Sequence, residues 1–268
     1  MVLYLCLIPN RGARIGHQTH EYFSLLTFCK KMNYKFVFHD FMCNSSEFNE
    51  LLQFHKIHEF NYNDVKNNMR VINVEEIIND FNKLISINLS EENICVYGQI
   101  CGHEDLIPKL YSFFNINVND IKQIKLEHIH FFTNNRMDLK ITDGEYITIH
   151  LRCGDVINDK SRYLNVDYFI NQYKKLVDIY PNDKQLPIYV ITEYNFTDDE
   201  YLKEHIPKCI IIKENALISL RYLIGCKYLI ASRSGFSNLA YILGNCQVIK
   251  PPDDWNDYFD NLIDLNIM

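Results

Sequence analysis

The sequence lacks several signatures that would place it in a familiar class of protein. No apolar run reaches the ~18 residues needed to span a bilayer, and there is no Gly-x-Ser-x-Gly elbow of a serine hydrolase. The cysteines form no Cys-x-x-Cys pair, and no His-Glu-x-x-His motif gives a metal site. A formal net charge of −7 argues against a broad basic surface for nucleic acid.

What is present is the composition of a globular protein. The 268 residues suffice for one large α/β domain or two small ones, and a hydrophobic fraction of 47% allows a sizeable core. Most of the nine cysteines lie inside apolar runs, as free buried thiols do, and their number is odd. This favours a reducing compartment. We therefore expect a cytoplasmic protein without a membrane span, and peripheral attachment to a membrane is left open.

The hydrophobic pattern alternates short apolar runs with longer amphipathic ones. Buried strands are predicted at residues 2–8, 35–39, 93–97, 146–151, 188–192, 209–212, 228–231 and 247–250. Helices are predicted at residues 16–32, 104–114, 118–128, 166–180, 216–226, 237–244 and 255–265. Residues 45–90 are polar and poorly patterned, and we expect helices there. Strands that alternate with helices indicate parallel sheets covered on both faces.

A polar stretch at residues 136–144, with an Asp-Gly turn signal, is the best candidate for a domain boundary. We expect an N-terminal Rossmann-like domain over residues 1–140 and a C-terminal one over residues 141–268. In such an arrangement the last helix can pack back on the N-terminal domain. Two doubly wound domains that face one another would form a central cleft at the carboxyl ends of their strands.

The strongest candidate site follows the strand at residues 146–151. Its end reads His150-Leu151-Arg152-Cys153-Gly154-Asp155. An arginine at the carboxyl edge of a parallel sheet can bind two phosphate oxygens, a glycine allows close approach of the backbone, and Asp155 can orient the arginine. The pattern alone equally allows a strand-end salt bridge beside a hydrogen-bonded histidine.

Two further segments follow strands in the same way. One is the turn Ser232-Arg233-Ser234-Gly235-Phe236-Ser237, where a helix begins and free N–H groups can bind phosphate. A plain serine N-cap explains that turn as well. The other is Arg14-Ile15-Gly16-His17-Gln18, which lacks the third glycine of a dinucleotide fingerprint.

Together the three segments resemble the GDP-fucose-dependent fucosyltransferases of the α1,2, α1,6 and protein O-fucosylating groups. In that superfamily a strand ends in His-x-Arg-Arg-Gly-Asp, and its first arginine, which contacts the donor diphosphate, falls on Arg152. The second arginine is replaced by Cys153. The later motif falls on the turn that contains Ser234, and the early one on the segment that contains Gly16. Clear resemblance covers roughly 35 residues, and the remainder agrees only in architecture.

The resemblance implies a GT-B fold and an inverting, metal-independent transfer of fucose from GDP-fucose to a glycan or another hydroxyl acceptor. It implies no tightly bound cofactor. Expected catalytic residues are Arg152, Asp155, His17 and Asp159, and Glu21 is a further candidate base. Expected donor-binding residues are His150, Arg152, Gly154, Glu193, Ser232, Ser234, Gly235, Phe236, Ser237, Arg14 and Gly16.

Three alternatives stay open at this point. The donor can be a different nucleotide sugar, or the chain can be a catalytically silent binder of nucleotide sugars or glycans on the same fold. Cys153 can also act as a nucleophile, if the nearby anion site lowers the pKa of its thiol.

Overall fold

The computed structural model describes residues 3–8, 15–37, 67, 69–88, 93–99, 106–117, 120, 145–244, 246–249 and 251. The chain divides into two compact units, Met1–Ile124 and Lys125–Met268. The boundary that we predicted at residues 136–144, the helix at residues 255–265 and most of the helix at residues 118–128 lie outside the described residues. No helix in the described part is long and apolar enough to cross a membrane.

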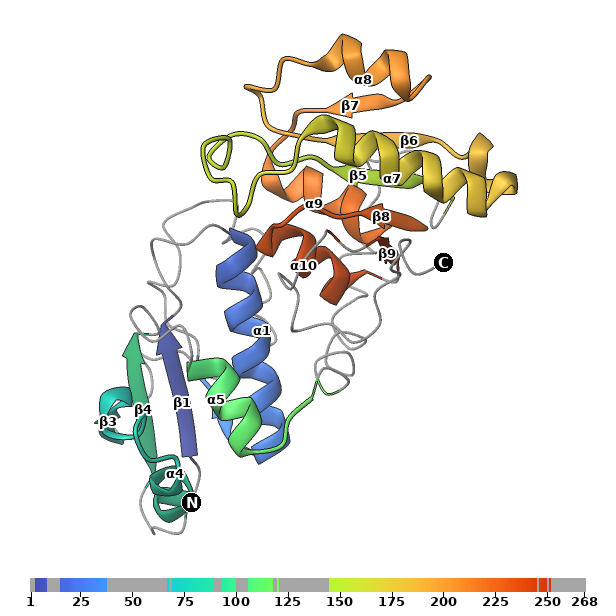
Figure 1. The fold of residues 1–268 in the computed structure, drawn as a ribbon. Helices are drawn as coiled ribbons and strands as arrows, with labels where there is room; N and C mark the ends of the chain where they lie inside the picture. The colour runs from blue at the N-terminus through green and yellow to red at the C-terminus, as the bar shows by residue number, and fades with distance from the viewer. Residues whose placement is uncertain are drawn as a thin grey trace. The chain divides into compact units, whose positions relative to one another are not determined.

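The N-terminal unit contains a four-stranded parallel sheet in the order β2-β1-β4-β3 (Figure 1). Its strands are β1 (Leu3–Ile8), β2 (Lys35–Phe36), β3 (Arg70–Asn73) and β4 (Ile94–Gln99). Its helices are α1 (Ile15–Met32), the short η4 (Val74–Glu76), α4 (Asn82–Asn88) and α5 (Leu106–Phe113). α1 packs against α5, where the Tyr111 hydroxyl donates to the Ser24 carbonyl over 2.9 Å.

The C-terminal unit contains a five-stranded parallel sheet in the order β7-β6-β5-β8-β9. The strands are β5 (Ile147–His150), β6 (Ile188–Ile191), β7 (Ile210–Ile212), β8 (Tyr228–Ile230) and β9 (Gln247–Ile249). The helices are α7 (Val166–Ile179), η5 (Pro181–Gln185), α8 (Asp199–His205), α9 (Ala216–Ile224) and α10 (Gly235–Leu243). The predicted strands of this half are all present, with ends that differ by at most one residue.

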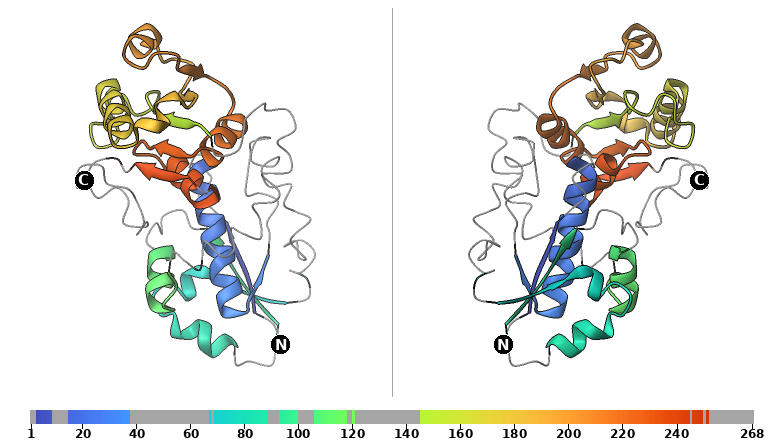
Figure 2. Two further views of the ribbon diagram at one scale, coloured as in Figure 1. Left: turned by 90° about the vertical axis from the view of Figure 1, so that its right-hand side faces the viewer. Right: turned by 90° about the vertical axis from the view of Figure 1, so that its left-hand side faces the viewer.

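Helices cover both faces of this second sheet, with α7 on one face and α9 on the other (Figure 2). Successive side chains of a strand point to opposite faces, so β5 contributes side chains both to the face covered by α7 and to the face covered by α9. Ile147 and Ile149 pack in the main core cluster with Phe169 of α7. Thr148 faces the other way and donates to the Tyr222 carbonyl of α9 over 3.1 Å. The next residues of that second face, at positions 150 and 152, are polar and mark the beginning of the candidate site.

α4 and η4 lie within residues 45–90, where helices were expected, whereas α8, η5 and β3 were not predicted. α8 buries only Leu202, so its hydrophobic periodicity is weak. β3 lies at the edge of its sheet and buries only Ile72 among its four residues, which leaves little alternation to recognise.

Candidate functional site

Arg152 lies at the carboxyl edge of the C-terminal sheet and is 6% exposed. It continues the face of β5 that Thr148 and His150 begin, because the alternation persists beyond the strand. The Leu151 N–H still donates to the Ile191 carbonyl over 2.9 Å, which keeps this backbone paired with β6. Arg152 therefore points towards α10, away from the core that α7 covers.

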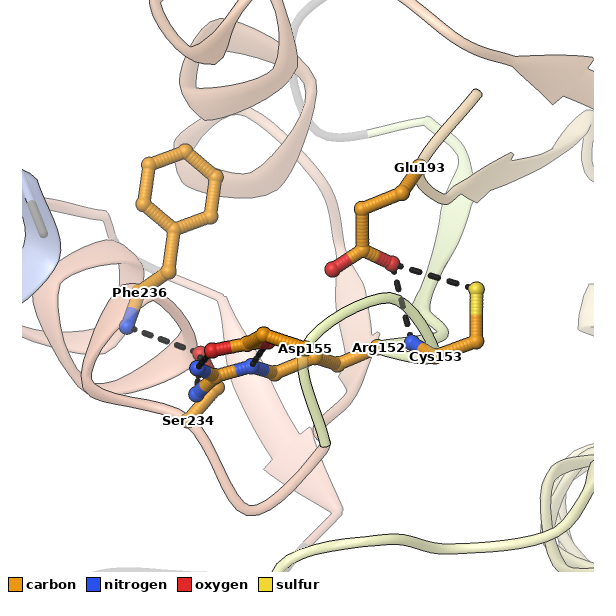
Figure 3. A network of polar contacts seen from close by, with 6 residues as sticks. All are labelled: Arg152, Cys153, Asp155, Glu193, Ser234 and Phe236. Carbon is orange, nitrogen blue, oxygen red and sulfur yellow. Dashed lines mark hydrogen bonds and ion pairs between the residues drawn. The ribbon is translucent and has the colours of Figure 1, made fainter. Parts of the chain in front are cut away.

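The Arg152 guanidinium is held by two partners (Figure 3). Nε and Nη2 donate to the two carboxylate oxygens of Asp155 over 3.2 and 2.8 Å. Nη1 lies 3.4 Å from the Ser234 hydroxyl oxygen. The structure thus brings together the two motifs that the sequence placed 82 residues apart. The Asp155 carboxylate forms a bidentate ion pair, and this gives it the orienting role that was one of its two predicted roles.

Ser234 is the N-cap of α10, where its hydroxyl oxygen accepts the Phe236 N–H over 3.1 Å. The helix begins at Gly235, two residues before the predicted start at Ser237, because the cap is Ser234. The first turn contains no acidic residue. The positive end of the helix dipole lies beside the Arg152 guanidinium, which contacts the N-cap Ser234. These groups make a polar environment suited to an anion.

His150 is buried behind this turn. Its Nδ1 lies 2.7 Å from the Ser237 hydroxyl and 3.0 Å from the Ser232 hydroxyl. Ser237 Oγ accepts the Ser232 N–H over 3.2 Å, so its own proton is available for Nδ1. Each hydroxyl can donate or accept, so these contacts suit a neutral imidazole with its proton on either ring nitrogen.

Burial lowers the pKa of His150 from 6.5 to about 4. The Glu193 carboxylate acts in the opposite direction, and the Arg152 charge adds to the lowering. His150 is therefore a neutral hydrogen-bonding group at physiological pH. It fixes the position of the turn at residues 232–237 against β5.

Cys153 does not belong to this polar face. It is 7% exposed within the hydrophobic cluster on the α7 side of the sheet. Its pKa is raised, chiefly by burial and also by the Glu193 charge, so the expectation that an anion site would lower this pKa is wrong. Its N–H donates to Glu193 Oε2 over 2.9 Å, and its Sγ lies 3.3 Å from the same oxygen.

Glu193 follows β6 and is held at the sheet edge by the Cys153 N–H (Figure 3). Its predicted contact with the donor stays a prediction. Gly154 imposes no steric demand, because a Cβ there would meet Glu193 and Asn195 at ordinary contact distances of 3.5 Å. Close approach of the backbone to a ligand is therefore the remaining predicted reason for a glycine at this position.

Asp159 lies in the loop between β5 and α7. Its Oδ1 accepts hydrogen bonds from the Ser161 N–H over 3.0 Å and from the Ser161 hydroxyl over 2.6 Å. The hydroxyl hydrogen bond is the main reason why the Asp159 pKa is lowered. These contacts make Asp159 a turn-stabilising group with reduced basicity.

The early loop is only partly described. Arg14 lies outside the described residues, whereas Gly16 and His17 lie in the first turn of α1, and Glu21 lies one turn later. The side chains of His17 and Glu21 are not among the described ones. Within the part of the chain that the structure describes, no three His, Cys, Asp or Glu residues gather as a metal site would require.

One contact was missed by the sequence reasoning. Arg233 was quoted as part of the serine turn but received no role, and its Nη1 donates to the Ser161 carbonyl over 3.0 Å. It thereby links the β8–α10 turn to the β5–α7 loop. A cationic side chain inside a turn that opens a helix was a visible signal, since cations are disfavoured at that end of a helix.

Comparison with solved structures finds similar folds among bacterial transferases. The heptosyltransferase WaaC of E. coli with ADP has a TM-score of 0.54 and 12% identity, covering 98% of this chain and 92% of its own. The same enzyme with ADP-2-deoxy-2-fluoro heptose gives 0.49 at the same identity and coverage. A glycosyl transferase family 9 protein from Veillonella parvula gives 0.44 at 7% identity, covering 92% of this chain and 80% of its own.

No family model matches the sequence, and no curated relative matches it. At 12% identity the likeness to WaaC shows the fold alone. It confirms the predicted α/β, GT-B-like class with parallel sheets.

Proposed function

We propose that this chain is an inverting, metal-independent glycosyltransferase that binds a nucleotide-sugar donor at the carboxyl edge of its C-terminal sheet. The observation that carries the proposal is the convergence of the Arg152 guanidinium on Ser234, the N-cap of α10. A buried arginine and the amino end of a helix both favour an anion at the same point. A diphosphate leaving group is the anion that this chemistry requires.

The GT-B-like fold supports the same conclusion. Ligands of open parallel α/β sheets bind outside the carboxyl ends of the strands, which is where Arg152, Glu193 and Ser234 lie. The WaaC structure with a TM-score of 0.54 was solved with ADP, a nucleoside diphosphate. The predicted contact of His150 with the donor stays part of the proposal.

In the proposed mechanism the diphosphate gains negative charge as the glycosidic bond breaks. Arg152 and the first N–H groups of α10 stabilise that charge without reorganising, since Asp155 and Ser234 already hold the guanidinium in place. Asp155 is therefore a positioning residue. The acceptor hydroxyl must also lose its proton. Asp155 and Asp159 already accept hydrogen bonds within the C-terminal unit, and Asp159, His17 and Glu21 stay the proposed candidates for the base.

We propose fucose from GDP-fucose as the transferred group, on the sequence resemblance alone, and a glycan or another hydroxyl as the acceptor. Cys153 occupies the position of the family's second arginine, and it is buried on the α7 side of the sheet, away from the polar face. Other nucleotide sugars should therefore be tested alongside GDP-fucose. A different nucleotide sugar and a silent nucleotide-sugar or glycan binder are the competing outcomes.

Thermal unfolding in the presence of GDP, UDP, ADP and their common sugar conjugates tests the donor. A ligand at ~100 times its Kd should stabilise the protein by about 2.7 kcal/mol. Release of free nucleotide from the stabilising conjugate then separates an enzyme from a silent binder. Transfer should persist in the presence of EDTA if no metal ion is needed.

The Arg152→Ala variant tests the site, with an expected loss of ~10²–10³ in turnover. Lys203→Ala is the matched control, because it breaks another i,i+3 ion pair, Lys203–Glu200, on the exposed surface of α8. Circular dichroism should show that both variants keep the fold. Unchanged turnover in a folded Arg152→Ala protein would refute the assignment of this site.

A further inference from the structure

The two most exposed large hydrophobic side chains among the described residues lie at one edge of the C-terminal sheet. Tyr194 is 74% exposed and Ile157 is 59% exposed. Tyr194 follows the carboxyl end of β6, and Ile157 follows that of the neighbouring strand β5. Because ligands of open parallel sheets bind at this edge, two exposed hydrophobic side chains here indicate an apolar contact for a ligand.

The turn that carries Tyr194 is anchored at both ends. The Phe196 N–H donates to the Glu193 carbonyl over 3.1 Å, which closes a four-residue turn around Tyr194. At one end, Glu193 Oε2 accepts the Cys153 N–H over 2.9 Å. At the other end, Phe196 is buried in the core cluster, and its carbonyl accepts a hydrogen bond from Lys213 over 2.7 Å. Tyr194 therefore projects into solvent from a fixed backbone.

Single exposed hydrophobic residues are common on protein surfaces, so the position of Tyr194 matters more than its exposure. The other exposed ones described in this unit are placed differently. Ile179 ends α7, Tyr201 lies within α8, and Ile210 begins β7 at the amino edge of the sheet. None of these three lies in a loop that follows the carboxyl end of a strand.

Tyr194 follows the strand next to the one that carries Arg152. Arg152 follows β5, and Ser234 follows β8 on the other side of β5. The β6–α8 loop contacts the β5–α7 loop, because a Cβ on Gly154 would lie 3.5 Å from Asn195 Oδ1. Adjacent strands are ~4.8 Å apart. A nucleotide whose diphosphate lies between β5 and β8 can therefore extend its nucleoside across β5 to the end of β6.

We propose that Tyr194 is the stacking surface for the nucleobase of the donor nucleotide. The inference rests on the proposed function, because it takes a nucleotide sugar as the ligand of this edge. Every nucleobase has a π face that can stack on an aromatic ring. A tyrosine suits this role because its large ring is immobilised at the cost of only two side-chain torsions.

The test compares nucleoside diphosphates with inorganic pyrophosphate, which has the charged group but no base. Binding of GDP, UDP, ADP and pyrophosphate is measured by isothermal titration. Tyr194→Ala removes the ring, and Tyr194→Phe keeps it. Ile210→Ala is the matched control, because it removes an exposed hydrophobic side chain at the opposite edge of the same sheet.

We expect Tyr194→Ala to weaken binding of the preferred nucleoside diphosphate by about 10- to 100-fold, the usual loss when a base-stacking ring is removed. Pyrophosphate binding should not change, and Tyr194→Phe and Ile210→Ala should bind as the parent chain does. Unweakened binding of the nucleoside diphosphate by Tyr194→Ala would refute the proposal. An equal loss for pyrophosphate would also refute it, as a sign of a disturbed turn, and so would an equal loss in Tyr194→Phe, as a sign of a hydrogen bond from the hydroxyl.

Chemical protection in the parent chain provides a second measurement that needs no variant. Tetranitromethane nitrates exposed tyrosine rings, and mass spectrometry of peptides measures the yield at Tyr194. Saturation with the preferred nucleoside diphosphate should protect Tyr194, saturation with pyrophosphate should not, and nitration of Tyr201 should stay the same in both. Unchanged nitration of Tyr194 in the nucleotide-saturated protein would contradict stacking.

These measurements separate the failure of this proposal from the failure of the proposed function. If the parent chain binds a nucleoside diphosphate more tightly than pyrophosphate and Tyr194→Ala binds it equally well, only the role of Tyr194 is refuted. If the parent chain binds pyrophosphate as tightly as every nucleoside diphosphate, the base is not recognised, and the role of Tyr194 is refuted while the anion site stands. If the parent chain binds none of the three nucleoside diphosphates, both proposals are refuted.

Discussion

Asp155, three residues after Arg152 in the same loop, accepts hydrogen bonds from its guanidinium with both carboxylate oxygens, at 2.8 Å from Nη2 and 3.2 Å from Nε. The Arg152 side chain is 7% exposed and the Asp155 side chain 35%, so Asp155 is the more solvent-exposed member of the pair. The ion pair leaves Nη1 directed at Ser234. The pair therefore gives Asp155 the role of a support for Arg152.

Asp155→Asn should reduce the rate of donor cleavage by about tenfold, less than the loss for Arg152→Ala, because one charge-assisted contact is weakened while the arginine remains. The measurement is kcat/KM for donor cleavage across a range of pH. If Asp155 is a positioning residue, its substitution lowers kcat/KM at every pH and leaves the acidic limb of the pH profile in place. Disappearance of that limb in Asp155→Asn would instead identify Asp155 as the base.

Acid should destabilise the C-terminal unit through His150. Its pKa is about 4 when folded and 6.5 ordinarily, so between these values the unfolded chain binds more protons. Stability therefore rises with pH across this window and is lost as pH falls through it, by up to about 3 kcal/mol. Urea unfolding from about pH 7 to about pH 5 measures the slope.

The control for this pH effect is a second histidine outside the site. His150→Gln should flatten the pH dependence of unfolding even if its stability at neutral pH is lower. His205→Gln, on α8 beside Tyr201, should keep the slope of the parent chain. An unchanged slope in His150→Gln would contradict the assignment of the effect to this buried imidazole.

Cys153 should be unreactive in the folded protein, because burial and the Glu193 charge raise its pKa and the thiolate is the reactive form. Mass spectrometry of peptides after brief iodoacetamide treatment should show little alkylation at this position until the protein is unfolded. Cys153→Ala keeps the N–H that binds Glu193 and should retain turnover, at a cost of ~1 kcal/mol in stability. Abolished turnover in a folded Cys153→Ala protein would revive the nucleophile alternative.

Gly98→Ala should destabilise the N-terminal unit, by about 1–3 kcal/mol. A Cβ on this residue of β4 would overlap Val74 Cγ1 and lie 2.7 Å from Val74 Cβ in η4. A double-mutant cycle with Val74→Ala should recover part of the loss. Gly154→Ala is the matched control, since its added Cβ has room and unfolding should be unaffected.

The strands of the C-terminal unit and the end of β5 could be predicted from sequence, because β-branched runs bounded by polar residues determine both. Alternation alone places His150 and Arg152 on one face. The N-cap at Ser234 was harder to predict, since Ser232, Ser234 and Ser237 all suit a cap and only packing selects one.

The roles of the acidic residues could not be read from sequence. Whether Asp155 binds Arg152 or stands ready as a base depends on the loop path between them. The environment of Cys153 likewise follows from which face of the sheet position 153 occupies, and proximity in sequence to Arg152 suggested the opposite. α8 carried a usable signal that was overlooked, with Asp199 and Glu200 in its first turn and Lys203 in its last.

Because β5 sends consecutive residues to opposite layers, its length is constrained more tightly than its composition. Insertion or deletion of a single residue before position 150 would move Arg152 into the hydrophobic core under α7. It would also place an aliphatic side chain at the proposed diphosphate site. Homologous chains should therefore exchange residues freely along this strand while conserving the count of residues between Ile147 and Asp155.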